Sequence, residues 1–203
     1  HTNNTKDQMK KTMMTASALL IATAVICAEK PTVSSDDFSD ATKSATHWKL
    51  SGKHVAVKDG VLSFNHGGTA QFKGNVPDNF TLSFDLAIPE PEKGKKVLGF
   101  SGLDINGIKF MIRNDGLYWG IYRLPGEKTS RGNAGKIFGF KFGKLDKITV
   151  ISKKTKKGFK YTCKVNDKQI VSFEYPGNEK RKLVFMAYKT KAIFDNFKLK
   201  PEG

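Results

Sequence analysis

Apolar and polar residues alternate with a period of two through most of the chain after residue 31. The clearest run covers residues 80–88, with Phe80, Leu82, Phe84, Leu86 and Ile88 on one side and Thr81, Ser83, Asp85 and Ala87 on the other. Further β-rich runs occupy 108–113, 145–152, 159–165, 169–175 and 183–188. Successive side chains of a strand point to opposite faces, so this pattern predicts half-buried strands.

Short turn signals separate these runs, among them Asp59-Gly60, Asn106-Gly107 and Asp115-Gly116. Asn-Gly and Asp-Gly are typical of tight hairpins. No stretch after residue 31 carries an apolar stripe of helical period and helical length. About eleven to thirteen short strands, each with one apolar face, predict an all-β fold, a two-sheet antiparallel β-sandwich of the jelly-roll type.

A different pattern precedes the strands. Lys10 and Lys11 follow Met9, residues 13–26 are uncharged and mostly apolar, and Ala28 ends the run. This order predicts a secretory signal peptide at 9–28, because its apolar run is shorter than the ~20 residues of a transmembrane helix. We expect residues 1–8 to be an upstream extension outside the fold. Residues 29–203 would then form one exported domain, periplasmic or extracellular, with no transmembrane segment in the mature chain.

The chain is strongly basic. It has 35 Lys and Arg against 19 Asp and Glu, a net charge of +16, which becomes +14 without Lys6, Lys10, Lys11 and Asp7. Lysine clusters lie at 93–96, 153–157 and 180–182. A basic exported domain could meet anionic polysaccharide, an anionic envelope surface or nucleic acid. Export, and the lack of an aromatic nucleic-acid signature on any strand, argue against nucleic acid.

Cys163 is the one cysteine after residue 28. It alternates with Phe159, Tyr161 and Val165, which predicts a buried small hydrophobe instead of a nucleophile.

Four segments occur in an order that resembles the concanavalin A-like jelly-roll superfamily. They are Asp36-Asp37-Phe38-Ser39 with Trp48, residues 55–62, residues 80–86, and Ile193-Phe194-Asp195-Asn196-Phe197. Within that superfamily the chain looks most like secreted bacterial domains related to family 16 glycoside hydrolases and to the 3-keto-disaccharide hydrolase domains. The resemblance implies that the first and last strands pair, which brings Phe38 near Phe197. It also implies, as one alternative, a hydrolase acting on glycosidic bonds or keto-sugars.

The sequence does not contain the catalytic strand that is typical of family 16 glycoside hydrolases. Family 16 enzymes share an alternating Glu-x-Asp-x-Glu strand, and no segment here matches it. A retaining glycosidase needs two carboxyls about 5–5.5 Å apart. Acids from different strands, such as Asp85 and Asp104, would have to converge to provide them.

The strongest candidate for binding is the stretch 109–123, which is expected to form a hairpin turning at Asp115-Gly116. If Leu117 and Ile121 face the core, Tyr118 and Tyr122 lie outward beside Lys109 and Arg113; Arg123 ends the hairpin and joins the candidate set. Aromatic faces stack on sugar rings, and arginine pairs with carboxylate or sulfate through two hydrogen bonds. The alternative is an ordinary sheet face with solvated cations and half-buried tyrosines.

Metal candidates are weaker. His47, His54 and His66 show no zinc-ligand spacing. Asp37, Asp59 and Asp195 could meet if the terminal strands pair, and calcium prefers such oxygen ligands; alternatively they bond local backbone in turns and caps. No other cofactor is expected. Three functions stay open: a carbohydrate-binding domain with anionic polysaccharide as a candidate ligand, the hydrolase, and a structural envelope or adhesion domain.

Overall fold

A computed structural model describes residues 34–90, 99–105, 107–113, 119–123, 141–177 and 182–203, with the backbone alone described at 119–123. The expected extension 1–8, the expected signal peptide 9–28, Tyr118 and the loop 124–136 lie outside these residues. The described residues contain no helix with the length and apolarity that crossing a bilayer requires.

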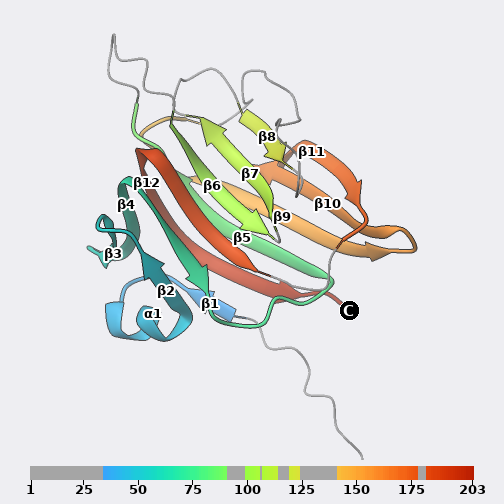
Figure 1. Cartoon of the computed structure of the whole chain (residues 1–203), viewed down its shortest axis with the longest axis horizontal. Helices are drawn as coiled ribbons and strands as arrows, with labels where there is room; N and C mark the ends of the chain where they lie inside the picture. Colours follow the sequence, from blue (N-terminus) through green and yellow to red (C-terminus); the bar gives the residue numbers. More distant parts are fainter. Residues whose placement is uncertain (1–33, 91–98, 106, 114–118, 124–140, 178–181) are drawn as a thin grey trace, which may run out of the picture. The chain divides into compact units, whose positions relative to one another are not determined.

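Twelve strands and one short helix make up the described part of the chain (Figure 1). The first half contains β1 (Ser34–Asp36), α1 (Ala41–His47), β2 (Trp48–Ser51), β3 (Val55–Lys58), β4 (Val61–Phe72), β5 (Phe80–Ala87) and β6 (Phe100–Ile105). The second half contains β7 (Ile108–Arg113), β8 (Trp119–Arg123), β9 (Asp146–Thr155), β10 (Gly158–Val165), β11 (Lys168–Tyr175) and β12 (Leu183–Pro201). The predicted all-β class is confirmed.

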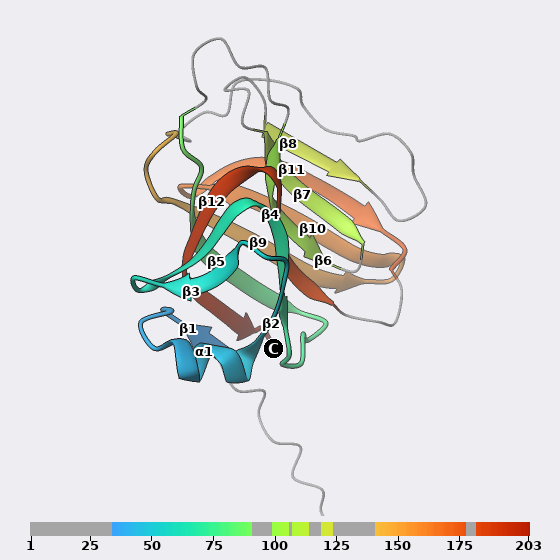
Figure 2. The same cartoon turned by 60° about the vertical axis from the view of Figure 1, so that its left-hand side comes forward.

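The strands form two layers, and the long strand β12 runs through both of them. Residues 183–188 pair with β6 and residues 193–201 pair with β5, all antiparallel. A register shift between Tyr188 and Lys191, where Lys189 has a φ of 51°, separates the two halves. The first layer contains β2, the end of β4, the start of β12, β6, β7 and β8. The second contains β11, β10, β9, β5, the end of β12 and β1 (Figures 1 and 2).

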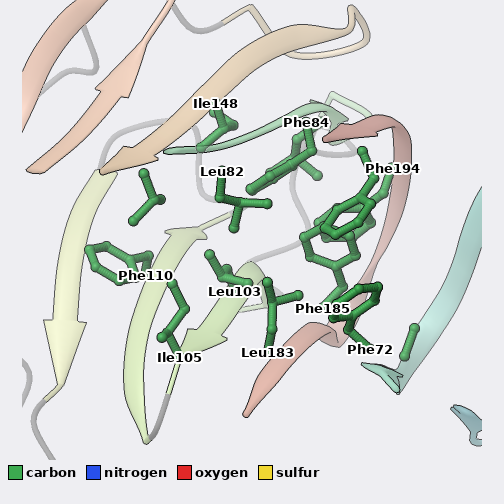
Figure 3. Close-up of a cluster of buried hydrophobic side chains, with 14 of the residues drawn as sticks. Phe72, Leu82, Phe84, Leu103, Ile105, Phe110, Ile148, Leu183, Phe185 and Phe194 are labelled. Atoms are coloured by element: carbon green, nitrogen blue, oxygen red, sulfur yellow. The ribbon is translucent and has the colours of Figure 1, made fainter. Parts of the chain in front are cut away.

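Phenylalanine, leucine and isoleucine fill the space between the layers (Figure 3). The ring of Phe185 on β12 lies 4.7 Å from that of Phe84 on β5 and 4.4 Å from that of Phe194. Phe110 on β7 lies 6.0 Å from Phe173 on β11. These contacts join strands far apart in the hydrogen-bonded order, so the layers pack face to face. Burying each such side chain contributes about 1.5–3 kcal/mol.

The first and last strands pair as the resemblance implies, since β1 pairs with the end of β12 and Asp36 lies opposite Phe197. Phe38 and Phe197 both contact the ring of Trp48, at 5.8 and 4.9 Å. The carboxylate of Asp36 is 4% exposed and accepts hydrogen bonds from the Phe38 N–H, the Ser44 hydroxyl and the Trp48 indole N–H. This buried carboxylate therefore ties β1 to α1 and β2.

Local predictions are mostly confirmed. Ile105 pairs with Ile108 across the expected hairpin, where Gly107 has a φ of 85°. Cys163 lies in the core, as predicted, and Trp48 is buried there too. The alternation did not indicate the short helix α1, which Asp40 caps by accepting hydrogen bonds from the backbone N–H groups of residues 42 and 43. Seven residues make two turns, too short for a periodic apolar stripe.

Candidate functional site

The outward side of the first layer carries an ordered set of aromatic and charged residues. Directly opposed residues of an antiparallel pair share a sheet face, so the register assigns them to rows. The first row contains Tyr188, Phe100 and Arg113; the second, whose residues are buried, contains Met186, Gly102 and Met111; the third contains Val184, Asp104 and Lys109. We call these nine residues the β6–β7 face.

An aromatic pair forms one edge of this face. The rings of Phe100 and Tyr188 stack with centroids 5.4 Å apart and planes 28° apart. Tyr188 is 49% exposed, and its opposed residue on β4 is Gly67, which has no side chain to cover it. The ammonium of Lys189 lies 5.2 Å from the Tyr188 ring centroid. The face therefore presents an aromatic ring to solvent beside cationic groups, an arrangement that suits a sugar ring bearing an acidic group.

A partly buried carboxyl lies two rows away. Oδ1 of Asp104 accepts a hydrogen bond of 2.6 Å from the Gly107 N–H. Burial raises the pKa of Asp104, while that bond and the charges of Lys109 and Lys182 oppose the rise. Asp104 can therefore accept hydrogen bonds from a ligand hydroxyl, and its raised pKa brings it closer to the range of a proton donor.

Asp85, the other acid considered for catalysis, lies elsewhere. It is on β5, whose neighbouring residues Phe84 and Leu86 face the core, so Asp85 is on the outward side of the second layer. There it accepts a 2.8 Å hydrogen bond from the Asn196 side chain. Asp85 and Asp104 lie on opposite outer sides of the sandwich and do not converge on one site.

The structure groups the residues of the candidate hairpin differently from the prediction. Lys109 and Arg113 do share the outward face, and the backbone of Arg123 lies opposite Lys109. Tyr122, however, lies opposite Phe110, which is 3% exposed and belongs to the core. In the register of β7 and β8, the backbone of Tyr122 therefore lies neither in the row of Lys109 nor in that of Arg113. A register shift between Met111 and Ile112 changes which residues of β8 lie opposite the outward residues of β7. No feature of the sequence indicates this shift.

Phe100 and Tyr188 were missed from the sequence, although one signal was available. In 183–188 the core positions are Leu183, Phe185 and Ala187, so the same alternation assigns Tyr188 to the outward side. A large aromatic residue in the outward phase indicates a surface that packs against a ligand or a partner.

Comparison with known proteins identifies the fold. No family model and no curated sequence matches the chain. Solved structures do. One is a sialidase, with a TM-score of 0.60, 13% identity and 83% of this chain covered. A second, described with endo-acting O-glycanases of the human gut microbiota, has a TM-score of 0.62 and 13% identity, with 84% of this chain and 99% of that chain covered.

A third similar structure is the carbohydrate binding module CBM66 from Bacillus subtilis, with a TM-score of 0.56 and 10% identity, covering 76% of this chain and 95% of that one. The chain spans only 18% of the sialidase. These similarities establish the β-sandwich architecture.

The three acids considered for calcium are only partly brought together. Burial raises the pKa of Asp195, and the charges of Asp85 and Asp37 raise it further. Asp37 accepts from the Ser39 hydroxyl at 2.7 Å and from its N–H at 3.1 Å, bonds that lower the pKa of Asp37. Asp59 instead lies in the β3–β4 turn, 3.8 Å from the Lys58 ammonium. The described residues contain no group of three His, Cys, Asp or Glu side chains fit to hold a metal ion.

A hollow of about 450 Å³ lies between α1 and the strands β2 and β3. Its lining is mostly apolar, with Ala41, Ala45, Leu50 and Val55 among its residues. Its hydroxyl group, on Ser44, is already bonded to Asp36. Orienting a polar ligand requires placed polar groups, so the β6–β7 face is the stronger candidate.

Proposed function

We propose that this chain is an exported carbohydrate-binding domain that holds an acidic glycan on the β6–β7 face. One observation carries the proposal: Tyr188 is half exposed, its ring is held by stacking on Phe100, and Arg113 lies opposite Phe100 in the next strand. A ring fixed in this way loses little freedom when a ligand stacks on it.

The first and third rows of the face have roles in this binding mode. The apolar side of a sugar ring packs on Tyr188, and the guanidinium of Arg113 meets a carboxylate or sulfate on that sugar. Asp104 and Lys109 hydrogen-bond hydroxyls of the neighbouring sugar. The similarity to a carbohydrate binding module supports this ligand class by analogy of fold.

The experiment compares Tyr188→Ala with Tyr188→Phe on affinity gels that contain neutral or uronate-bearing polysaccharide. We expect retention to fall on the order of tenfold in Tyr188→Ala, because the stacking surface is removed, and to stay near the wild-type value in Tyr188→Phe. Arg113→Gln should weaken binding to the uronate gel alone. Equal retention of Tyr188→Ala and wild type on every gel refutes the proposed face.

Export is supported by the signal-peptide pattern at 9–28. Expression of the full chain in a bacterium with a periplasm tests it. N-terminal sequencing of the fractionated protein should show a mature chain that starts at Glu29, whereas an uncleaved cytoplasmic protein would refute export.

Hydrolysis is the second candidate, because Asp104 is a partly buried acid with a raised pKa on the same face. Asp104→Asn separates the two functions, since asparagine keeps the acceptor for the Gly107 N–H. A hydrolase should lose turnover and keep affinity for its glycan, whereas a wild-type protein that binds glycan and releases no product is a binding domain.

A further inference from the structure

The outward side of the second layer has a different character from the β6–β7 face. Register places two adjacent rows across it. The first row is Ser172, Thr162, Ile151, Thr81 and Lys200; the second is Gln169, Lys164, Thr149, Ser83, Lys198 and Ser35. Neither row contains an acid. Lys153 and Lys160 lie directly opposite each other beyond the first row, with Glu174 of β11 opposite Lys160. Beyond the second row lie the acids Asp85 and Asp195.

We call Lys153, Lys160, Lys164, Lys198 and Lys200 the lysine face. Among the described residues, none of the first four lies within 4.0 Å of a carboxylate, and Lys200 lies 3.7 Å from Glu202. Like charges directly opposed on a sheet destabilise it, and Lys153 faces Lys160 in this way. Glu174, opposite Lys160 on β11, offsets part of this repulsion, and a polyanion that covered the face would relieve the rest.

The spacing of the lysines suits an extended polymer. Lys164 on β10 and Lys198 on β12 are separated by three interstrand steps, about 14 Å, and Lys198 and Lys200 by about 7 Å along one strand. Hydroxyl side chains occupy the positions between them. Thr162 and Ser172 lie within hydrogen-bonding distance of each other, 3.0 Å between their oxygens. Such hydroxyls can exchange hydrogen bonds with sugar hydroxyls.

The residues of these rows also favour a polysaccharide over other polyanions. The large hydrophobic residues that are exposed, Leu50, Leu145, Tyr188 and Ile193, all lie outside the two rows. Surface helices and loops that enter a bilayer use such side chains, and single-stranded nucleic acid stacks on aromatic rings. The rows provide cations and hydroxyls.

We infer that the lysine face is a second binding site, separate from the β6–β7 face, for an extended acidic polysaccharide bearing uronate or sulfate groups. Because the two faces lie on opposite outer sides of the sandwich, one polymer chain and one separate glycan can be held at the same time. The domain would then link an acidic matrix to a glycan ligand.

The test uses a triple variant, Lys160→Gln, Lys164→Gln and Lys198→Gln, with polygalacturonate and dextran sulfate as the acidic probes. The matched control is Lys43→Gln, Lys53→Gln and Lys58→Gln, which removes the same charge from exposed positions in α1, the β2–β3 turn and β3. We expect affinity for either probe to fall on the order of tenfold or more in the lysine-face variant, most clearly at low salt, and to stay near the wild-type value in the control. Melting temperatures of both variants verify folding.

Several results would overturn the inference. One is equal affinity of the lysine-face variant and wild type; another is an equal loss in both triple variants, which would mean that net charge alone attracts the polymer. Phosphatidylserine vesicles and single-stranded DNA are measured in parallel, and binding to either as tight as to polygalacturonate would refute a polysaccharide site. Because the β6–β7 face is itself proposed to hold an acidic glycan, both triple variants are also made in a Tyr188→Ala, Arg113→Gln background, where the acidic probes report on the lysine face. The part of the uronate-gel retention that depends on Tyr188 should persist in the lysine-face variant, so failure of one site is distinguishable from failure of the other.

Discussion

Replacement of Asp36 by asparagine tests how strongly its carboxylate holds β1 to α1 and β2. In the wild type, Oδ1 accepts from the Phe38 N–H at 2.9 Å and the Ser44 hydroxyl at 2.9 Å, and Oδ2 accepts from the Trp48 indole N–H at 3.1 Å. Asparagine has one oxygen and one NH₂ group. Since the backbone and indole N–H groups only donate, either orientation of the amide leaves one of them facing another donor.

The size of the effect follows from this conflict. A buried donor without an acceptor costs about 1–3 kcal/mol, and the remaining bonds lose the extra strength that an ionised acceptor provides. Asparagine carries no charge, so the cost of burying the Asp36 carboxylate is absent in the variant, and this offsets part of the loss. We expect Asp36→Asn to lower the free energy of unfolding by about 2 kcal/mol, a large part of the 5–15 kcal/mol typical of a domain.

The assay is urea unfolding at neutral pH, followed by tryptophan fluorescence and circular dichroism. Ser44→Ala is the control, because it removes a donor and leaves the carboxylate with its other partners; about 1 kcal/mol is expected. A double-mutant cycle with Trp48→Phe isolates the indole bond from the loss of packing. If Asp36→Asn unfolds within about 0.5 kcal/mol of the wild type, the desolvation of the carboxylate cancels its hydrogen bonds and the reasoning is wrong.

Three further predictions concern other parts of the sandwich. Gly102→Ala should destabilise the fold by about 3 kcal/mol or more, because a Cβ would lie 1.9 Å from the Phe110 carbonyl oxygen; a wild-type urea midpoint would contradict this. The raised pKa of Asp195 means that its contribution to stability is present at acid pH and is lost as pH rises from 3.8 through the pKa of the folded protein. Asp195→Asn should therefore have a higher melting temperature than the wild type at neutral pH and lose this advantage at acid pH, whereas a lower melting temperature at neutral pH would refute it. Burial raises the pKa of the Cys163 thiol to about 12, so Ellman's reagent should react with it only after unfolding; rapid reaction of the native protein would contradict the buried position.

Alternation was sufficient to predict many of the strands, the core positions on them and the fold class, because burial of one face imposes a period of two. It could not predict that β12 continues for 19 residues through both layers. Its bend occurs at Lys189, a residue that is not typical of turns. Which residues of β8 lie opposite the outward residues of β7 depends on a register shift in the pairing of these strands, and the sequence of β8 does not indicate it.

The candidate face could not be predicted because its parts come from distant segments. Phe100, Tyr188 and Arg113 become neighbours only through the order β12-β6-β7, which the alternation of single strands does not contain. Once that order exists, however, the phase that buries Phe185 and Ala187 also turns Tyr188 outward. A slip of one residue would exchange the two sets, so packing of the core and presentation of the aromatic ring depend on the same register. The same coupling holds in the second layer, where Tyr161 and Cys163 enter the core while Lys160 and Lys164 face outward. The register that packs the core therefore also decides which side chains the two outer surfaces present.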